Sequence, residues 1–194
     1  WVLSVARGPV LFYDIDTPVT LAKLARDDHE YLAPDLVPRF DAYLSFTGGP
    51  TLDQLEEVFG ARHAVALYCS CEPALHPPPA SLSERTHDLG YLGTYSVDRQ
   101  PSLDELLLEP ARRWRRGNFV VAGPLYPPEI AWPANVQRIE HVKPGDHPDF
   151  YGRQRFTLNI TRADMKRAGW SPSVRLFEAA ACGTPILIGP STRN

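Results

Sequence analysis

Short apolar runs alternate with amphipathic segments along the whole chain. We interpret the apolar runs as strands, at residues 9–14, 40–46, 63–69, 88–95, 118–123, 135–141, 156–160 and 186–188. Apolar residues recur at helical spacing between several of these runs, most clearly at 17–25, 51–59 and 103–116. This alternation predicts an α/β fold, in which doubly wound parallel sheets are flanked by helices.

Residues 171–188 predict a loop, a short helix and a buried strand. Ser171 or Ser173 can cap the helix, and Gly183 ends it. We expect the buried side of the helix to be formed by Leu176, Phe177 and Ala180. The following run, 186–188, is apolar on both faces, as is typical of a parallel strand covered by helices.

The entrance to this helix is a candidate phosphate site. The amides of Ser173 and Val174 have no intrahelical acceptor and lie at the positive end of the helix dipole. Glu178, about a turn and a half further on, can accept two hydrogen bonds from a vicinal diol such as ribose. The alternative is a generic Rossmann-like helix whose glutamate is simply solvated.

The same segment carries a family resemblance. Residues 176–186 read LFEAAACGTPI, which resembles the LEAMACGxPVI signature in the donor domain of GT-B glycosyltransferases. With residues 158–165 and 171–175, the resemblance narrows to the spore-maturation CgeB-like glycosyltransferases. Many relatives carry an acidic residue eight positions before the glutamate, where this chain has Trp170. The identity of the sugar and the stereochemical outcome therefore stay open.

The resemblance implies a function. We expect a hexosyltransferase-like enzyme that moves a sugar from a nucleotide-sugar, whose ribose is held by Glu178, to an unknown acceptor: a glycan, a protein or a small molecule. No cofactor and no metal are expected, since GT-B enzymes usually stabilise the leaving diphosphate with backbone dipoles and basic side chains. The alternative is a non-catalytic GT-B-like module that binds a nucleotide or a protein.

Three further residues fall within recognisable motifs of the family: Asn159, Arg162 and Arg175. The two arginines can neutralise the diphosphate, or can brace the loop by pairing with Asp164 or Glu178.

The strand and loop at 88–101 are similar to the start of GT-B donor domains, where glycine and a basic residue meet the diphosphate. The resemblance makes Arg99 a phosphate candidate, with close backbone supplied by Gly93 and Thr94. The alternative is a surface ion pair between Arg99 and a nearby aspartate.

Two more candidates lie at strand ends. Asp16 follows the strand at 9–14 and precedes a helix, so it is either the catalytic base or a helix cap. His141 ends a run that resembles the short strand before the base-binding region, and is either a cleft residue or a structural one. We rank His147 below it.

The resemblance predicts two Rossmann-like lobes of the GT-B type. We expect a partial acceptor-side lobe at 1–75, a linker at 76–87 in a proline-rich stretch, and a donor-binding lobe at 88–194. The chain starts without a methionine and stops just after a core strand, so we expect both lobes to be truncated.

Charge and composition limit the kinds of partner and the cell location that we expect for this chain. A net charge of −3 gives no electrostatic footprint for nucleic acid, and no apolar run is long enough to span a bilayer. Three cysteines cannot all pair within the chain, which favours a cytoplasmic location. Cys69, Cys71 and His76 lack the second ligand pair of a structural zinc site, so we expect plain thiols.

Overall fold

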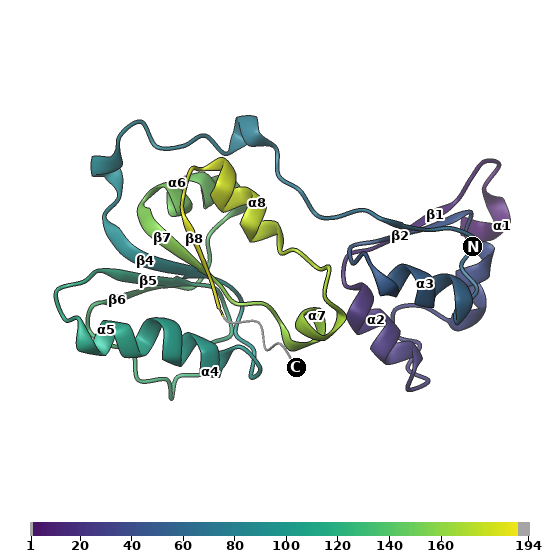
Figure 1. The fold of residues 1–194 in the computed structure, drawn as a ribbon, viewed down its shortest axis with the longest axis horizontal. Helices are drawn as coiled ribbons and strands as arrows, with labels where there is room; N and C mark the ends of the chain where they lie inside the picture. Colours follow the sequence, from purple (N-terminus) through teal and green to yellow (C-terminus); the bar gives the residue numbers. More distant parts are fainter. Residues whose placement is uncertain (1, 190–194) are drawn as a thin grey trace. The chain divides into compact units, whose positions relative to one another are not determined.

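The computed structural model describes residues 2–189, and these divide into two compact units (Figure 1). The first unit comprises the chain up to Cys69 together with Asp164–Pro172, and the second comprises Ser70–Ala163 with the chain from Ser173 onward. Each unit contains one sheet, and both sheets are parallel. The predicted α/β fold with parallel sheets flanked by helices is confirmed. The predicted donor lobe contains Asp164–Pro172, which pack with the first unit; its finer boundaries stay a prediction.

The first unit is built on a three-stranded sheet of order β1-β2-β3. Its strands are β1 (Leu11–Asp14), β2 (Ala42–Ser45) and β3 (Ala64–Ala66). Its helical elements are α1 (Val2–Val5), α2 (Thr17–Leu24), η1 (Pro34–Arg39), α3 (Pro50–Glu57) and most of α7 (Ala163–Ala168).

Only one face of this sheet is buried. Tyr43 on β2 is 1% exposed and packs with Leu21 of α2 and Leu55 of α3. On the opposite face Leu11 and Tyr13, from the run predicted as a buried strand, are 55% and 43% exposed. That part of the prediction is wrong, because no element within the described residues covers this face.

The second unit is built on a five-stranded sheet of order β6-β5-β4-β7-β8. Its strands are β4 (His87–Leu92), β5 (Phe119–Ala122), β6 (Val136–Ile139), β7 (Gln154–Asn159) and β8 (Ile186–Ile188). Its helical elements are η2 (Pro73–Leu75), η3 (Leu82–Glu84), α4 (Gln100–Leu103), η4 (Asp104–Leu108), α5 (Glu109–Arg113), η5 (Pro144–Asp146), α6 (His147–Gly152) and α8 (Val174–Ala181).

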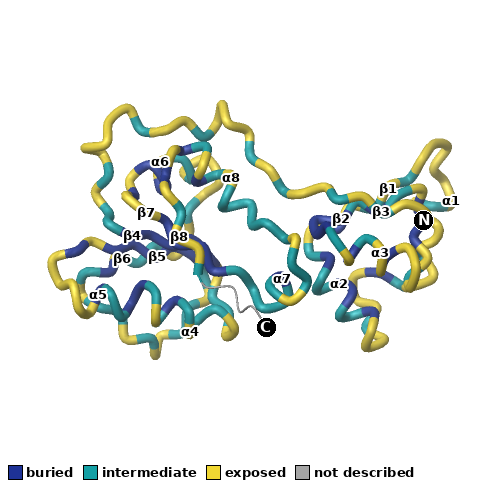
Figure 2. Tube along the Cα trace, viewed as in Figure 1, coloured by how far each residue is buried: buried dark blue, intermediate teal, exposed yellow. Residues whose placement is uncertain are grey.

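Helices cover both faces of this second sheet (Figure 1). The continuous helical run from α4 to α5 buries Leu103 and Leu107 against one face. On the other face, α6 and α8 bury Tyr151, Ala179 and Cys182. Figure 2 shows the central strands β4 and β5 buried between these layers. The arrangement is the layered core of a Rossmann-like unit.

The buried side of α8 differs from the one that we predicted. Ala179 and Cys182 are fully buried, whereas Phe177 is 36% exposed and Ala180 is exposed. Small residues face inward because the helix packs closely on α6 and β7. The predicted apolar side of α8 is therefore wrong.

The proline-rich stretch before β4 belongs to the second unit. We call residues 72–85 the proline-rich strap. Arg85 at its end donates a 2.6 Å hydrogen bond from Nη2 to the carbonyl oxygen of Gly183, two residues past the end of α8. His76 in the strap places Nε2 4.0 Å from Oε1 of Glu178. The strap is thus fastened to the same helix that carries the candidate phosphate site.

Candidate functional site

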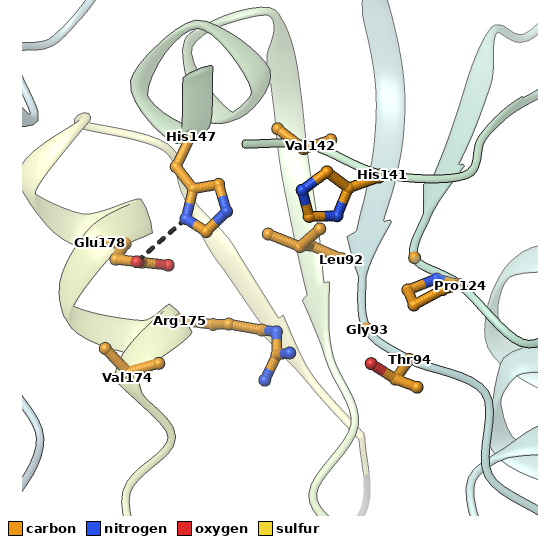
Figure 3. Close-up of a pocket in the computed structure, with 11 residues that line it drawn as sticks. Leu92, Gly93, Thr94, Pro124, His141, Val142, His147, Val174, Arg175 and Glu178 are labelled. Carbon is orange, nitrogen blue, oxygen red and sulfur yellow. Dashed lines mark hydrogen bonds and ion pairs between the residues drawn. The ribbon is translucent and has the colours of Figure 1, made fainter. Parts of the chain in front are cut away.

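A cavity of about 180 Å³ lies at the carboxyl ends of the central strands of the second unit (Figure 3). The loops after β4, β5 and β6 form one side of it, and α6 and α8 form the other. Six of the predicted site residues line it, namely Gly93, Thr94, His141, Val174, Arg175 and Glu178. In parallel α/β sheets, this edge is where ligands bind.

The loops after β4 and β5 run unusually close together. The amide of Gly93 donates to the carbonyl oxygen of Ala122 at 2.9 Å, and Tyr126 donates its hydroxyl hydrogen to the carbonyl oxygen of Gly93 at 3.1 Å. Gly123 has φ +138°, and a Cβ there would stand 2.0 Å from the Gly93 oxygen. Only glycine fits at position 123, because a side chain would force the two loops apart.

The amino end of α8 opens toward this cavity. Ser173 caps the helix as predicted, its hydroxyl oxygen accepting from the amide of Arg175 at 3.4 Å. The hydroxyl of Ser171 instead donates to the carbonyl oxygen of Gly169. Among residues 2–189, the amides of Ser173 and Val174 have no hydrogen-bond acceptor. They are the unsatisfied donors that a helix start offers to an anion.

Arg175 extends from α8 into the space between that helix and the Gly93–Thr94 loop (Figure 3). Its Nε is buried and has no hydrogen-bond partner in the described part of the chain. Within residues 2–189 it forms no ion pair with Asp164 or Glu178, which pair with Arg167 and His147 instead, so it does not brace the loop in that way. A buried guanidinium nitrogen without a hydrogen-bond partner is costly, which makes this position suited to an anionic ligand.

Glu178 faces the same cavity, and its side chain is only 12% exposed. Oε1 accepts from Nδ1 of His147 at 3.1 Å, and Oε2 accepts from the hydroxyl of Tyr151 at 3.2 Å. Burial first, and then the negative charge of Glu178, raise the pKa of Tyr151, so this hydroxyl stays protonated and donates. The structure excludes the alternative of a simply solvated glutamate.

Arg99 fastens the loop after β4. Its Nη2 donates to the carbonyl oxygen of Thr94 at 2.6 Å and its Nε to the hydroxyl of Ser96 at 2.9 Å. Burial disfavours ionisation of Asp98, but hydrogen bonds from Ser96 and the amide of Ala163, with Arg99 nearby, together lower its pKa. Arg99 therefore shapes a loop whose Thr94 lines the cavity, and its contact with a phosphate stays a prediction.

The other predicted residues lie outside the lining. Asn159 is buried at the end of β7, where its Nδ2 donates to the hydroxyl of Thr161 at 3.3 Å. Arg162 follows in the turn before α7 and is half-buried. Asp16 lies in the first unit at the N-cap position of α2, and its amide donates to Oδ1 of Asp14. The catalytic role of Asp16 stays a prediction.

Two contacts of Glu178 were missed from the sequence. Tyr151 was not considered, and His147 was ranked below His141 although it touches the carboxylate directly. A usable signal existed, because His147 and Tyr151 are four residues apart on α6 and so share one helix face. The docking of that face on α8 is a tertiary contact that no local pattern encodes.

Neither a metal site nor a membrane span is found in the described residues. No group of three or more His, Cys, Asp or Glu among residues 2–189 is placed to hold a metal ion. Within the same range, every helix is too short or too polar to cross a bilayer. Cys69, Cys71 and Cys182 are free thiols.

Comparison with known proteins agrees with this fold. Residues 99–193 match the model of a family described as glycosyl transferase-like. HepE from Anabaena, solved in complex with UDP-glucose, is 14% identical with a TM-score of 0.65 over 95% of this chain and 54% of that chain. The chain has the fold of the GT-B glycosyltransferases.

Two other solved structures share this GT-B fold. Sucrose-phosphate synthase from Thermosynechococcus elongatus is 12% identical, with a TM-score of 0.60 over 95% of this chain and 51% of that chain. A TarM mutant from S. aureus was solved in complex with fondaparinux, alpha-GlcNAc-glycerol and UDP. It is 9% identical, with a TM-score of 0.59 over 84% of this chain and 32% of that chain. This chain thus spans about half the length of HepE and of the synthase. A comparison with curated proteins found no significant match.

Proposed function

We propose that this chain is part of a glycosyltransferase, and that its second unit binds the ribose and diphosphate of a nucleotide-sugar donor. One observation carries the proposal: a buried guanidinium nitrogen without a partner and an oriented carboxylate, from Arg175 and Glu178 of one helix, line the same cavity. The CgeB-like subfamily and a hexosyl group as the transferred sugar are the finer parts of this proposal.

The diphosphate fits the amino end of α8. The amides of Ser173 and Val174 supply two donors at the positive end of the helix dipole, and Arg175 adds a positive charge whose buried Nε has no partner among residues 2–189. Across the cavity, the backbone of Gly93 and Thr94 approaches without bulky side chains. Arg99, Arg162 and Asn159 then support the loops around the anion.

The ribose fits Glu178, one turn further along α8. A carboxylate has about four lone-pair sites, and His147 and Tyr151 occupy two of them. Two sites remain for the hydroxyls of a diol. The cavity of about 180 Å³ is smaller than typical ligand pockets of roughly 300–1,000 Å³, so it accommodates this middle part of the donor. The base then extends past His141 and Val142, and the sugar extends out of the cavity.

Transfer breaks the bond between the anomeric carbon and the diphosphate oxygen. The departing nucleoside diphosphate takes the electron pair, and the amides of α8 with Arg175 stabilise the charge that develops on it. The acceptor hydroxyl forms the new bond and gives up its proton, for which we propose Asp16 as the base. We propose that no metal ion takes part, because these donors already face the leaving group.

A non-catalytic nucleotide-binding module is the second candidate, and Trp170 favours it. Where relatives carry an acidic residue, this chain places a tryptophan whose ring packs on Gly49 of the first unit. Incubating the full-length protein with UDP-glucose distinguishes the transferase from the non-catalytic module. The transferase cleaves UDP-glucose and produces free UDP, whereas the module binds UDP but does not cleave the bond to glucose. We also propose a cytoplasmic location for this protein, because its three cysteines are free thiols.

The test is a calorimetric screen of nucleoside diphosphates, starting with UDP because HepE and TarM were solved with UDP or UDP-glucose. We expect Glu178→Ala to weaken the best binder by roughly 1–3 kcal/mol, since a buried hydrogen-bond acceptor is lost. Glu105→Ala, at an exposed position of η4, is the matched control and should bind normally. If no nucleoside diphosphate binds the unmodified chain, the proposal is overturned.

A further inference from the structure

Glu178 is enclosed by donors from a neighbouring helix rather than by residues of its own helix. His147 and Tyr151 both come from α6, one turn apart, and each donates to a different oxygen of the carboxylate. The two rings also contact each other edge-to-face, with centroids 6.3 Å apart. The plane of the carboxylate is therefore fixed from two sides.

We propose that His147 and Tyr151 are positioning residues that hold Glu178 ready for a vicinal diol, so that the site selects ribonucleotides over 2′-deoxyribonucleotides. This inference rests on the proposed function, because it assumes that Glu178 receives the sugar of a nucleotide.

The hydrogen-bond roles follow from the chemistry of the groups. An ionised carboxylate only accepts, so Nδ1 of His147 carries a hydrogen in whichever charge state the ring adopts. Tyr151 likewise donates its hydroxyl hydrogen to Oε2. With one lone pair used on each oxygen, the two that remain belong to different oxygens. Two adjacent hydroxyls match that pair, whereas a 2′-deoxyribose leaves one of them unsatisfied.

The frame that carries these donors is rigid. Tyr151 is 1% exposed, and its carbonyl oxygen accepts from the hydroxyl of Thr184 at 2.8 Å, which ties α6 to the chain after α8. On a third side, His76 of the strap places Nε2 4.0 Å from Oε1, beyond hydrogen-bond distance, while its Nδ1 donates to the carbonyl oxygen of Glu72. The open approach to the carboxylate is then the cavity itself. A carboxylate that is already held in place loses little conformational freedom when the nucleotide binds. Each hydrogen bond from a ribose hydroxyl therefore contributes more of its free energy to binding.

Binding of UDP and dUDP to the 194-residue chain tests the inference by calorimetry. We expect the unmodified chain to prefer UDP by about tenfold or more, as a lost hydrogen bond to a charged group requires. Tyr151→Phe and His147→Leu should each weaken the binding of UDP by about five- to tenfold and leave the binding of dUDP almost unchanged, so the preference for UDP over dUDP falls. His147→Asn keeps an amide nitrogen close to the position of Nδ1 and should restore most of the preference.

Tyr43→Phe is the matched control. It removes another buried tyrosine hydroxyl that donates to a carboxylate, at 2.6 Å to Asp14 in the first unit, and should change stability without changing the UDP to dUDP ratio. If Tyr151→Phe fails to fold, the two His147 variants decide the question. Equal binding of UDP and dUDP, or an unchanged ratio in the variants, overturns the inference while nucleotide binding stands. Absence of all nucleoside diphosphate binding overturns the proposed function instead.

Discussion

The indole ring of Trp170 occupies the space that a side chain on residue 49 would need. A Cβ on Gly49 would stand 2.4 Å from Cδ1 of Trp170. Both residues adopt positive φ, +59° for Gly49 and +48° for Trp170, and the amide of Gly48 donates to the carbonyl oxygen of Trp170 at 3.1 Å. Glycine at position 49 therefore leaves room for the indole of Trp170, which lies against it although the tryptophan is 67% exposed.

Gly49→Ala should destabilise the protein by about 2–4 kcal/mol, since it combines a clash with a left-handed backbone. Thermal denaturation measures the loss. Gly145→Ala is the matched control, because nothing lies within 4 Å of a Cβ there, and we expect it to be nearly neutral. Adding Trp170→Ala to Gly49→Ala should restore the part of the stability that is lost through the clash with the indole ring. If the double variant is no more stable than Gly49→Ala alone, the packing explanation is wrong.

Arg138→Lys should cost about 1–3 kcal/mol of stability. The guanidinium donates to the carbonyl oxygens of Val121 and Gly123, and it packs over the rings of Tyr126 and Trp132, 4.3 and 4.5 Å from their centroids. Burial lowers its pKa, yet an arginine stays charged, and lysine cannot form the same paired contact. Urea denaturation should show the loss, whereas Arg116→Lys at an exposed position should not.

Arg175→Met should separate stability from binding. Because the native guanidinium has a buried Nε without a partner, its removal should leave the melting temperature unchanged or higher. Affinity for UDP should fall by about tenfold or more, since a charge-assisted contact is worth about 1.5–3 kcal/mol. Calorimetry measures the change in affinity for UDP, and thermal denaturation of the same sample measures the change in melting temperature. A variant that melts lower and binds UDP normally would show that Arg175 is a structural residue.

Asp98→Asn should reduce stability by about 0.5–1 kcal/mol near neutral pH, the low end for a charged hydrogen bond because Asp98 is exposed. Its folded pKa lies below the ordinary value of 3.8, so the ionised form stabilises the fold above that value. This contribution is lost as the pH falls through the folded pKa. The difference in stability between the two proteins should therefore shrink as the pH falls below 3.8, and a difference that stays constant as the pH falls would contradict the assignment.

Cys182 should be the slowest of the three thiols to react with an alkylating reagent. Burial first, then the nearby Cys71 and Glu178, raise its pKa to about 11, and its side chain is fully buried. Cys69 and Cys71 are half-buried. Mass spectrometry at pH 8 should find Cys182 unmodified until denaturant is added. Early labelling of Cys182 would mean that α8 does not pack as described.

The fold class and the candidate helix were predictable because their signals are local. Residues 171–188 carry a cap, an apolar side and a stop within one short stretch, and the helix and strand lie there. The prediction that this strand is buried on both faces is wrong, because β8 is an edge strand in which Leu187 and Ile188 are 44% and 67% exposed. The buried side of α8 was not predictable, because small residues such as Ala179 are buried only where another helix approaches closely. The exposure of Leu11 and Tyr13 was also missed, since a sequence pattern does not reveal whether a second layer covers the sheet.

The candidate site was predictable in part for the same reason. Glu178 and Arg175 lie in the motif that carries the family resemblance, and both face one cavity. The surroundings of Glu178 come from residues 27 and 31 positions earlier in the chain, and from the strap beyond them. Those contacts depend on how α6 and the strap dock on α8, which helical periodicity cannot specify.

The bond from Arg85 to Gly183 bears on how this protein can be divided. A shortened version that begins at β4 would keep every strand of the larger sheet but would remove His76 and uncover one side of Glu178 to water. Expression of the larger unit alone should therefore start at Ser70, ahead of the prolines, so that His76 and Arg85 keep their places beside α8.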